Sequence, residues 1–103
     1  MSKKPLPPAK PEIVRIFPEF SPQFREDLLW WARKNTRYWE RIWDLIEAIL
    51  TDPFCGIGKP EPLKHIGTNF WSRRIDQEHR LVYRVEKDRV LFLQARFHYE
   101  KNG

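Results

Sequence analysis

Hydrophobic and polar positions in the first half of the chain follow a helical period. Phe24, Leu28 and Trp31 recur at helical spacing through about Lys34. A second apolar stripe follows over residues 39–49 and again keeps to one face. Apolar residues at this spacing are typical of amphipathic helices that bury one side. The pattern therefore predicts two helices.

The residues around these stripes supply start and stop signals. Ser21-Pro22 places an N-cap hydroxyl before a proline at the first helical position. Asn35-Thr36 breaks the pattern and offers a cap for the second helix, which is expected to end before Asp52-Pro53. Because the break is so short, the two helices should form an antiparallel hairpin.

The remaining segments indicate strands and one long loop. Residues 13–17 are β-branched and apolar, which indicates a first strand whose extent Pro18 limits. Residues 53–67 are rich in proline and glycine and are expected to form a loop. Alternating runs with hairpin-length connectors follow over residues 69–75, 79–86 and 89–98. The order β-α-α-β-β-β predicts an α+β fold, with a helical hairpin packed on a small antiparallel sheet.

Alternation within the last three runs separates an apolar face from a cationic one, because alternate side chains of a strand share a face. The positions expected to face the helices are Trp71, Ile75, Leu81, Tyr83, Val85, Leu91, Leu93, Ala95 and Phe97, with Arg73 falling among them. The open face is then expected to gather Arg74, Arg80, Arg84, Arg96 and His98. Such a face is either a solvated surface or a phosphate-binding surface, since the guanidinium fork binds phosphate oxygens bidentately.

Length and charge further restrict the domain organisation and the class of partner. The 103 residues suit one domain, expected over residues 13–99 between a flexible Pro/Lys-rich arm at 1–12 and a tail at 100–103. A hydrophobic content of 41% argues against global disorder, and a net charge of +5 fits nucleic acid or an acidic protein as partner. Cys55 is the only cysteine, and neither a membrane-spanning run nor a signal peptide is recognised, so a reducing cytoplasm is expected.

One short segment, KPEPLKH, holds the carboxylate of Glu61 between two prolines. The plainer interpretation is a loop carboxylate paired loosely with Lys59 or Lys64. The functional interpretation is a positioned general base, because Pro60 and Pro62 restrict the backbone on either side of it. Both remain open from the residues alone.

A base beside a cationic face suits cleavage of RNA through its own 2′-hydroxyl. The base removes the hydroxyl proton, cations stabilise the phosphorane, and an acid protonates the leaving 5′-oxygen. His98 is the natural acid, because its reference pKa of about 6.5 lies near working pH. This chemistry needs no metal or cofactor.

Other candidate sites are weaker. Cys55 with His65 or His79 has no fixed spacing to a base, so a packed thiol is favoured over a nucleophile. The histidines and the cysteine show no metal-ligand spacing. The run 56–59, Gly-Ile-Gly-Lys, is only a fragment of a phosphate-binding loop.

Four ordered blocks closely resemble the YoeB family, which are toxins of bacterial type II toxin–antitoxin pairs within the RelE-like superfamily. The blocks are GKPEPLKH at 58–65, FWSRRI at 70–75, EHRLVY at 78–83 and RFHY at 96–99. The resemblance implies an endoribonuclease that cuts mRNA in the ribosomal decoding site. It also implies an antitoxin of the YefM type as partner and a homodimer.

Site roles follow from the same resemblance, motif by motif. Glu61 matches the general base, His98 the general acid and Arg80 the arginine that stabilises the transition state. Lys64, Arg74 and Tyr99 match residues that orient or hold the RNA, and Lys59 is counted with these RNA-binding residues.

Two other functions stay open. The first is a related toxin that inhibits a protein target such as DNA gyrase, which would have no use for the Glu61–His98 acid–base pair. The second is a non-catalytic nucleic-acid-binding corepressor, whose binding would survive loss of Glu61. Residues 100–103 extend beyond the His-Tyr pair at which family members commonly finish.

Overall fold

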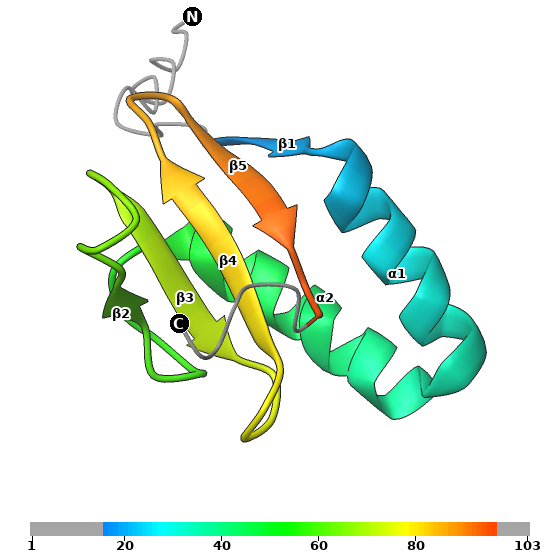
Figure 1. The fold of residues 1–103 in the computed structure, drawn as a ribbon. Coiled ribbons are helices and arrows are strands. Elements are labelled where there is room, and N and C mark those ends of the chain that lie inside the picture. The colour runs from blue at the N-terminus through cyan, green and yellow to red at the C-terminus, as the bar shows by residue number, and fades with distance from the viewer. Residues whose placement is uncertain (1–15, 97–103) are drawn as a thin grey trace, which may run out of the picture.

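The computed structural model describes residues 16–96 and contains two helices and five strands (Figure 1). In chain order they are β1 (Phe17–Phe20), α1 (Pro22–Lys34), α2 (Thr36–Thr51), β2 (Glu61–Pro62), β3 (Phe70–Arg74), β4 (Arg80–Val85) and β5 (Arg89–Gln94). The predicted α+β fold with a helical hairpin on one sheet is confirmed. The expectations for the arm at 1–12, for residues 13–15, for Phe97, His98 and Tyr99 and for the tail lie outside the described residues.

Both helices begin at the caps that the sequence predicts. The Ser21 hydroxyl accepts the amide of Phe24 at 3.0 Å, and Pro22 occupies the first helical turn. Asn35 ends α1 and caps α2, because its Oδ1 accepts the amides of Arg37 and Tyr38. Each cap satisfies helix-end donors that would otherwise lack a partner. One asparagine therefore sets the bend of the hairpin.

The sheet has the strand order β1-β5-β4-β3-β2, and it is mixed rather than wholly antiparallel. Strands β2 to β5 pair antiparallel, whereas β1 pairs with β5 in parallel. Strands joined by a tight turn must pair antiparallel. The helical hairpin and three strands lie between β1 and β5 in the chain, so these two strands are free to pair in parallel.

Strand β1 extends through Pro18 rather than stopping there. It lies at the edge of the sheet, with β5 as its only neighbour. An edge strand needs amide donors only on its paired side, so a proline without an N–H is tolerated. Pro18 is therefore part of the strand.

Residues 53–67, expected to form a loop, contain the two-residue strand β2. Glu61 lies opposite Ser72 of β3, and Pro62 lies opposite Trp71. The Leu63 amide continues the pairing by donating to the Phe70 carbonyl at 2.7 Å. Glu61 of the KPEPLKH segment therefore lies in an edge strand of the sheet.

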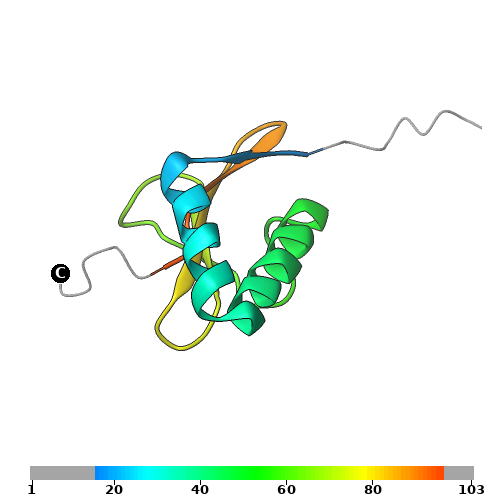
Figure 2. The same cartoon turned by 90° about the vertical axis from the view of Figure 1, so that its right-hand side faces the viewer.

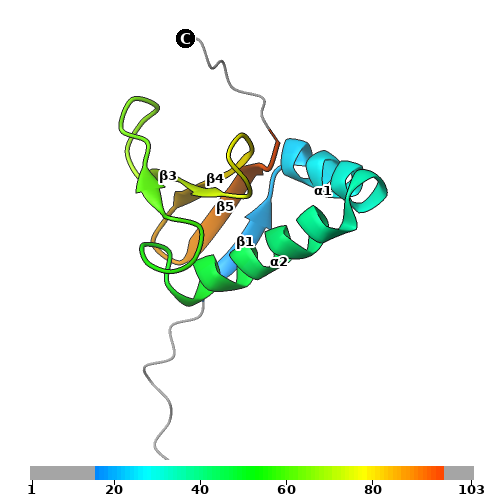
Figure 3. The same ribbon diagram turned by 90° about the horizontal axis from the view of Figure 1, so that it is seen from below.

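The helices and the sheet enclose one core. Figure 1 shows α2 passing behind the sheet, and the views of Figures 2 and 3 place α1 beside β5. Side chains from both layers are fully buried between them: Phe24, Ile42, Leu45 and Ile49 from the helices, and Leu81, Tyr83, Val90 and Phe92 from the strands. The opposite face of the sheet carries no helix among the described elements.

The predicted alternation is right for β4 and wrong for the first part of β5. Val90 and Phe92 are fully buried, whereas Leu91 and Leu93 are only partly buried. The register shifts between Val82, which pairs with Gln94, and Tyr83, which pairs with Phe92. Leu93 is therefore an extra residue, and such a bulge reverses the alternation beyond it. Ala95 is buried, as predicted, and Gln94 lies on the open face.

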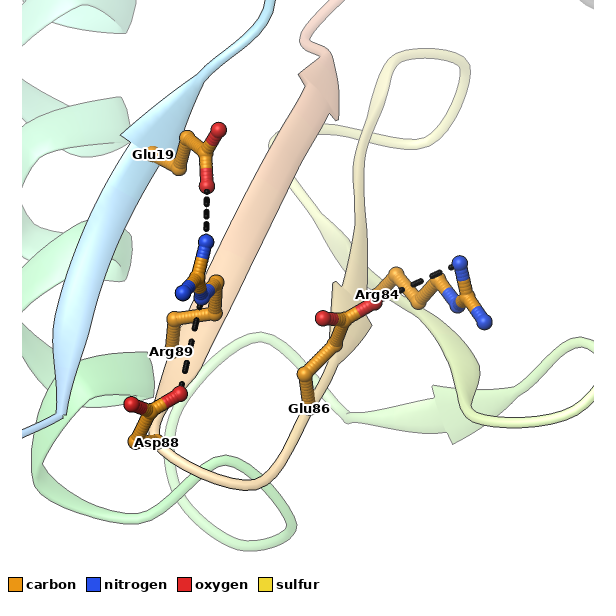
Figure 4. A network of polar contacts seen from close by, with 5 residues as sticks. All are labelled: Glu19, Arg84, Glu86, Asp88 and Arg89. Carbon is orange, nitrogen blue, oxygen red and sulfur yellow. Dashed lines mark hydrogen bonds and ion pairs between the residues drawn. The ribbon is translucent and has the colours of Figure 1, made fainter.

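Exposed ion pairs tie the strand ends together (Figure 4). Arg89 joins Glu19 of β1 at 3.0 Å and Asp88 at 3.5 Å, and these partners raise its pKa. Arg84, expected on the cationic face, pairs with Glu86 at 3.3 Å. Exposed pairs contribute little to stability, so β1 is held chiefly by its backbone pairing and by the packing of Phe20.

No helix in the described part of the chain is long and apolar enough to cross a membrane.

Candidate functional site

Glu61 and Arg80 meet on the open face of the sheet. Arg80 is the first residue of β4, and its Nη1 lies 3.3 Å from Glu61 Oε1 and 3.2 Å from the hydroxyl of Ser72. Ser72 lies on β3, between the strands that carry the two charged residues. The fold brings into contact Glu61, expected as the general base, and Arg80, expected as the arginine that stabilises the transition state.

A pocket of about 260 Å³ adjoins this ion pair. The sheet contributes Glu61, Ser72, Arg80, Val82 and Gln94 to its lining. The loop after β2 contributes Leu63, His65 and Ile66. Ser72 and Val82 are buried although they lie on the face opposite the helical core. Side chains of the loop and of the sheet together line one concave site.

The pocket follows one row of paired residues across four strands. Glu61 lies opposite Ser72, Ser72 opposite Val82, and Val82 opposite Gln94. Residues paired in this way share one face of a sheet. The carboxylate of Glu61 therefore belongs to one end of the pocket and the amide of Gln94 to the other.

The segment leading into Glu61 is fixed from the helix side by Arg73. This side chain is fully buried, and its guanidinium donates to the carbonyls of Asp52 (2.7 Å), Cys55 (3.0 Å) and Ile57 (3.1 Å). Its Nε donates to the Tyr83 hydroxyl at 3.1 Å. A buried guanidinium needs such partners, and here they hold the loop at residues 52–57.

Two glycines allow this loop to approach Arg73 closely. Gly56 and Gly58 have φ of +129° and +86°, where side chains are strained. A Cβ at Gly56 would lie 2.9 Å from Arg73 Nη1, and one at Gly58 would lie 2.7 Å from a methyl carbon of Leu45. The glycines of the Gly-Ile-Gly-Lys run therefore allow close packing against Arg73 and Leu45.

Tyr83 completes this buried network. Its hydroxyl donates to the Pro53 carbonyl at 2.7 Å and accepts from Arg73. Burial raises the pKa of the Tyr83 phenol, although the neighbouring guanidinium acts in the opposite direction. The hydroxyl thus stays protonated and acts as a structural donor.

The other predicted cations lie around the site rather than in it. Arg74 is exposed and lies directly opposite Arg80 in the register, so two positive charges stand side by side. Lys64 lines a separate hollow with Pro62 and Trp71, and Lys59 is exposed with a φ of +50°. His98 and Tyr99 lie outside the described residues.

Three residues acquire importance that the sequence did not reveal. Arg73 was noted only as a charge on the apolar side, and that misfit was the available signal for it. His65 belongs to the KPEPLKH segment but was given no role in the site, and it lines the pocket of Glu61. Gln94 had no assigned role and carries no motif.

Arg96, expected on the open face, stacks on a helix instead. Its guanidinium carbon lies 3.8 Å from the centroid of the Trp30 ring of α1. Such stacking is a favourable cation–π arrangement. Within residues 16–96 no group of three or more His, Cys, Asp or Glu side chains is placed so that it could hold a metal ion.

Comparisons with known proteins identify the family of this chain. Residues 20–99 match the family model described as the YoeB-like toxin of bacterial type II toxin–antitoxin systems. Toxin YoeB of Mycobacterium bovis is 52% identical over 80 residues, which cover 78% of this chain and 94% of that protein.

Two solved structures from Staphylococcus aureus share the fold. The YoeB dimer has a TM-score of 0.75 and 37% identity, and covers 82% of this chain and 99% of its own. The heterotetrameric YoeB–YefM complex has a TM-score of 0.73 and 37% identity, with the same coverage. The matched residues include both helices, strands β2 to β5, and Glu61 with Arg80. The chain therefore belongs to the YoeB-like toxins of bacterial type II toxin–antitoxin systems.

Proposed function

We propose that this chain is a ribosome-dependent mRNA endoribonuclease that acts in the bacterial cytoplasm through the 2′-hydroxyl of its substrate. The observation that carries the proposal is the Glu61–Arg80 ion pair beside a concave pocket on a cationic sheet face. A gyrase inhibitor or a passive binding module has no need for a carboxylate held in this way.

Glu61 takes the role of general base in this proposal. Its carboxylate accepts the 2′-hydroxyl proton, the 2′-oxygen bonds to phosphorus, and the bond from phosphorus to the 5′-oxygen breaks. Arg80 contacts Glu61 in the free protein, and a substrate phosphate would compete for its guanidinium. Binding would then release the carboxylate toward the hydroxyl while Arg80 stabilises the phosphorane.

His98 gives the proton that the leaving 5′-oxygen takes up, and Tyr99 helps to hold the RNA. Both roles rest on the family resemblance. Arg74, beside Arg80, and the flanking Lys59 and Lys64 hold the phosphates on either side. With the acid, the base and the charge supplied by side chains, the reaction requires no metal.

We further propose a YefM-like antitoxin as partner and a homodimer as the free state. The S. aureus relatives solved as a YoeB–YefM heterotetramer and as a YoeB dimer support these assignments. A cationic site for RNA also attracts an acidic peptide, which would displace the substrate.

The decisive experiment compares Glu61→Gln with Glu47→Gln, an exposed glutamate on α2 away from the pocket. Single-turnover cleavage on programmed ribosomes should fall by about 100-fold or more for Glu61→Gln, the usual scale for a general base, and should not change for Glu47→Gln. Cleavage should persist in EDTA once ribosome integrity is controlled, and should leave a 2′,3′-cyclic phosphate or 3′-phosphate beside a 5′-hydroxyl.

Cleavage by Glu61→Gln at the wild-type rate would show that Glu61 is not the general base. A 5′-phosphate on the downstream product would exclude attack by the 2′-hydroxyl. Absence of cleavage by the wild-type chain, with tight binding of gyrase or of DNA, would favour the alternatives.

A further inference from the structure

Residues 93–96, at the end of β5 and just beyond it, lie against helix α1 instead of against β1 (Figure 3). The pairing of β1 with β5 ends before this segment begins. The hydroxyl of Ser21, the cap of α1, donates to the Leu93 carbonyl at 2.9 Å. At the other end of the segment, Arg96 stacks on Trp30 of α1. Side chains of the helix and of its cap therefore hold the segment where β1 has ended.

Both backbone groups of Ala95 are bound by side chains of α1. Asp27 Oδ2 accepts the Ala95 amide, and the indole N–H of Trp31 donates to the Ala95 carbonyl, each at 2.8 Å. Gln23 supports the carboxyl group by donating to Oδ1 at 3.0 Å. Asp27 and Ala95 are fully buried, and Trp31 is 4% exposed. An apolar side chain often stabilises such a buried position at least as well as a charged one, so the carboxyl group is better explained by the orientation that it imposes on Ala95.

The segment that is held in this way leads from the pocket toward His98. Gln94 lines the pocket at the end opposite Glu61, and three strand intervals separate the two, roughly 14 Å between backbones at the usual strand spacing. His98 follows Ala95 by three residues, which an extended chain spans in at most about 11 Å. An acid that serves the 5′-oxygen and a base that serves the 2′-hydroxyl reach the phosphate from different sides. The position of Ala95 therefore limits where the imidazole can lie.

We infer that Asp27 and Trp31 are positioning residues, which hold the end of β5 so that His98 can protonate the leaving 5′-oxygen. The inference rests on the proposed function and extends it to two residues that do not line the pocket. As the bond from phosphorus to the 5′-oxygen breaks, this oxygen takes the imidazolium proton, and the two α1 residues act only through the backbone of Ala95. A catalytic group displaced by about 1 Å can slow a reaction by about 100-fold, so such an effect needs no contact with RNA.

The test uses a leaving group that needs no acid. Ribosomes are programmed either with ordinary mRNA or with mRNA in which one sulfur atom replaces the bridging 5′-oxygen at the cut position. A thiol has a pKa of about 8.5 and is far more acidic than an alcohol, so the sulfur leaves as a thiolate without a proton from His98. Attack by the 2′-hydroxyl still requires Glu61 and Arg80. A general disturbance of the fold therefore slows cleavage of both mRNAs.

Two variants remove the contacts to Ala95. Asp27→Leu removes the acceptor at similar volume, and Trp31→Phe removes the donor but keeps an aromatic ring, so that one variant decides should the other fail to fold. On ordinary mRNA, both should cleave at least about tenfold more slowly than the wild type in single turnover, with ribosome binding unchanged. On the sulfur mRNA, the loss relative to the wild type should shrink to less than about threefold, as it should for His98→Gln. Glu61→Gln should keep its full defect on both mRNAs.

The matched controls are Glu26→Leu, at the exposed neighbour of Asp27, and Trp39→Phe, at an exposed tryptophan of α2. Both should cleave both mRNAs at the wild-type rate. A folded Asp27→Leu or Trp31→Phe that cuts ordinary mRNA at the wild-type rate would overturn the inference.

The inference and the proposed function fail in different ways. Loss of rate by the same factor on both mRNAs in the Asp27 and Trp31 variants, with recovery of His98→Gln on the sulfur mRNA, would reject the inference and leave the proposed function intact. Absence of cleavage of either mRNA by the wild-type chain would reject the proposed function, and the inference with it.

Discussion

Arg73 is a fully buried charge whose hydrogen bonds all go to the polypeptide segments that it fixes. Its guanidinium group donates hydrogen bonds to three backbone carbonyls and to one phenol oxygen. Removing one side of such a network leaves buried acceptors without partners, which costs more free energy than the bonds contributed. The residue therefore links the stability of the sheet to the position of Glu61.

Arg73→Met should lower the free energy of unfolding by about 3 kcal/mol, because it keeps the chain length but removes every donor. The matched control is Arg74→Met, an exposed neighbour on the opposite face, which should change stability by less than about 0.5 kcal/mol. Urea unfolding measures both. Equal stability of the two variants would mean that the network is not needed to hold the loop.

Asp76 is the corresponding anchor in the β3–β4 turn. Burial acts to raise its pKa, but the amides of His79 and Glu78 and the Tyr38 hydroxyl outweigh burial, so that its pKa lies below the ordinary value. The hydrogen bond between Tyr38 and Asp76 also raises the pKa of the Tyr38 phenol. A carboxyl group with a lowered pKa in the folded state stabilises the fold above its unfolded pKa of about 3.9. That contribution is lost as the pH falls through the folded pKa.

Asp76→Asn should therefore destabilise the protein at pH 7 by roughly 1 kcal/mol, and the difference from wild type should shrink toward pH 3. Urea unfolding between pH 7 and pH 3 measures the free energy of unfolding of both proteins. Tyr38→Phe, which removes one of the three donors, should reproduce only part of the effect. A difference independent of pH would show that the charge of Asp76 is not what matters.

At the scale of elements, one asparagine joins the two helices. Asn35 ends α1 and its side chain accepts two amides at the start of α2. Both helices bury their apolar stripes in the same core, so a change in the bend between them disturbs the packing of both.

Asn35→Ala should cost about 1 kcal/mol, the usual value of an N-cap, and should lower Tm by several degrees. Thr36→Ala, at the adjacent exposed position, is the control and should have a smaller effect. Differential scanning calorimetry distinguishes them. A Tm shift that is the same for both variants would argue against the cap.

At the scale of the whole molecule, positive charge gathers on the face without helices. Arg74 and Arg80 lie opposite each other, and Lys59 and Lys64 flank the strand that carries Glu61. This face is the surface that we propose for both RNA and the acidic antitoxin, and such binding weakens as salt screens it.

Binding of a YefM-like antitoxin should weaken by roughly tenfold in Arg74→Glu, and by less in Arg33→Glu, which reverses a charge at the end of α1. Titration calorimetry at several salt concentrations checks both. The difference in antitoxin affinity between the two variants should become smaller at high salt. A larger loss for Arg33→Glu would place the antitoxin on the helices.

The features of this protein that depend on neighbours within a few residues could be predicted from the amino-acid sequence. The helical stripes, the caps at Ser21 and Asn35 and the β3–β4–β5 meander all follow from local spacing and turn chemistry. The four family blocks also indicated Glu61 and Arg80, although the roles of these residues stay predictions. Each of these features is encoded in a short window, because side chains three or four apart on a helix, or two apart on a strand, share a face.

The features that join distant segments could be seen only in the folded chain. The parallel pairing of β1 with β5, the pairing of Glu61 with Ser72, and the buried contacts of Arg73 with residues 52–57 link positions far apart in the chain. The extra residue at Leu93 has the largest effect, because a shift of one residue moves every following side chain to the other face. That shift explains why Val90 and Phe92 are buried rather than Leu91 and Leu93, and no local pattern records it.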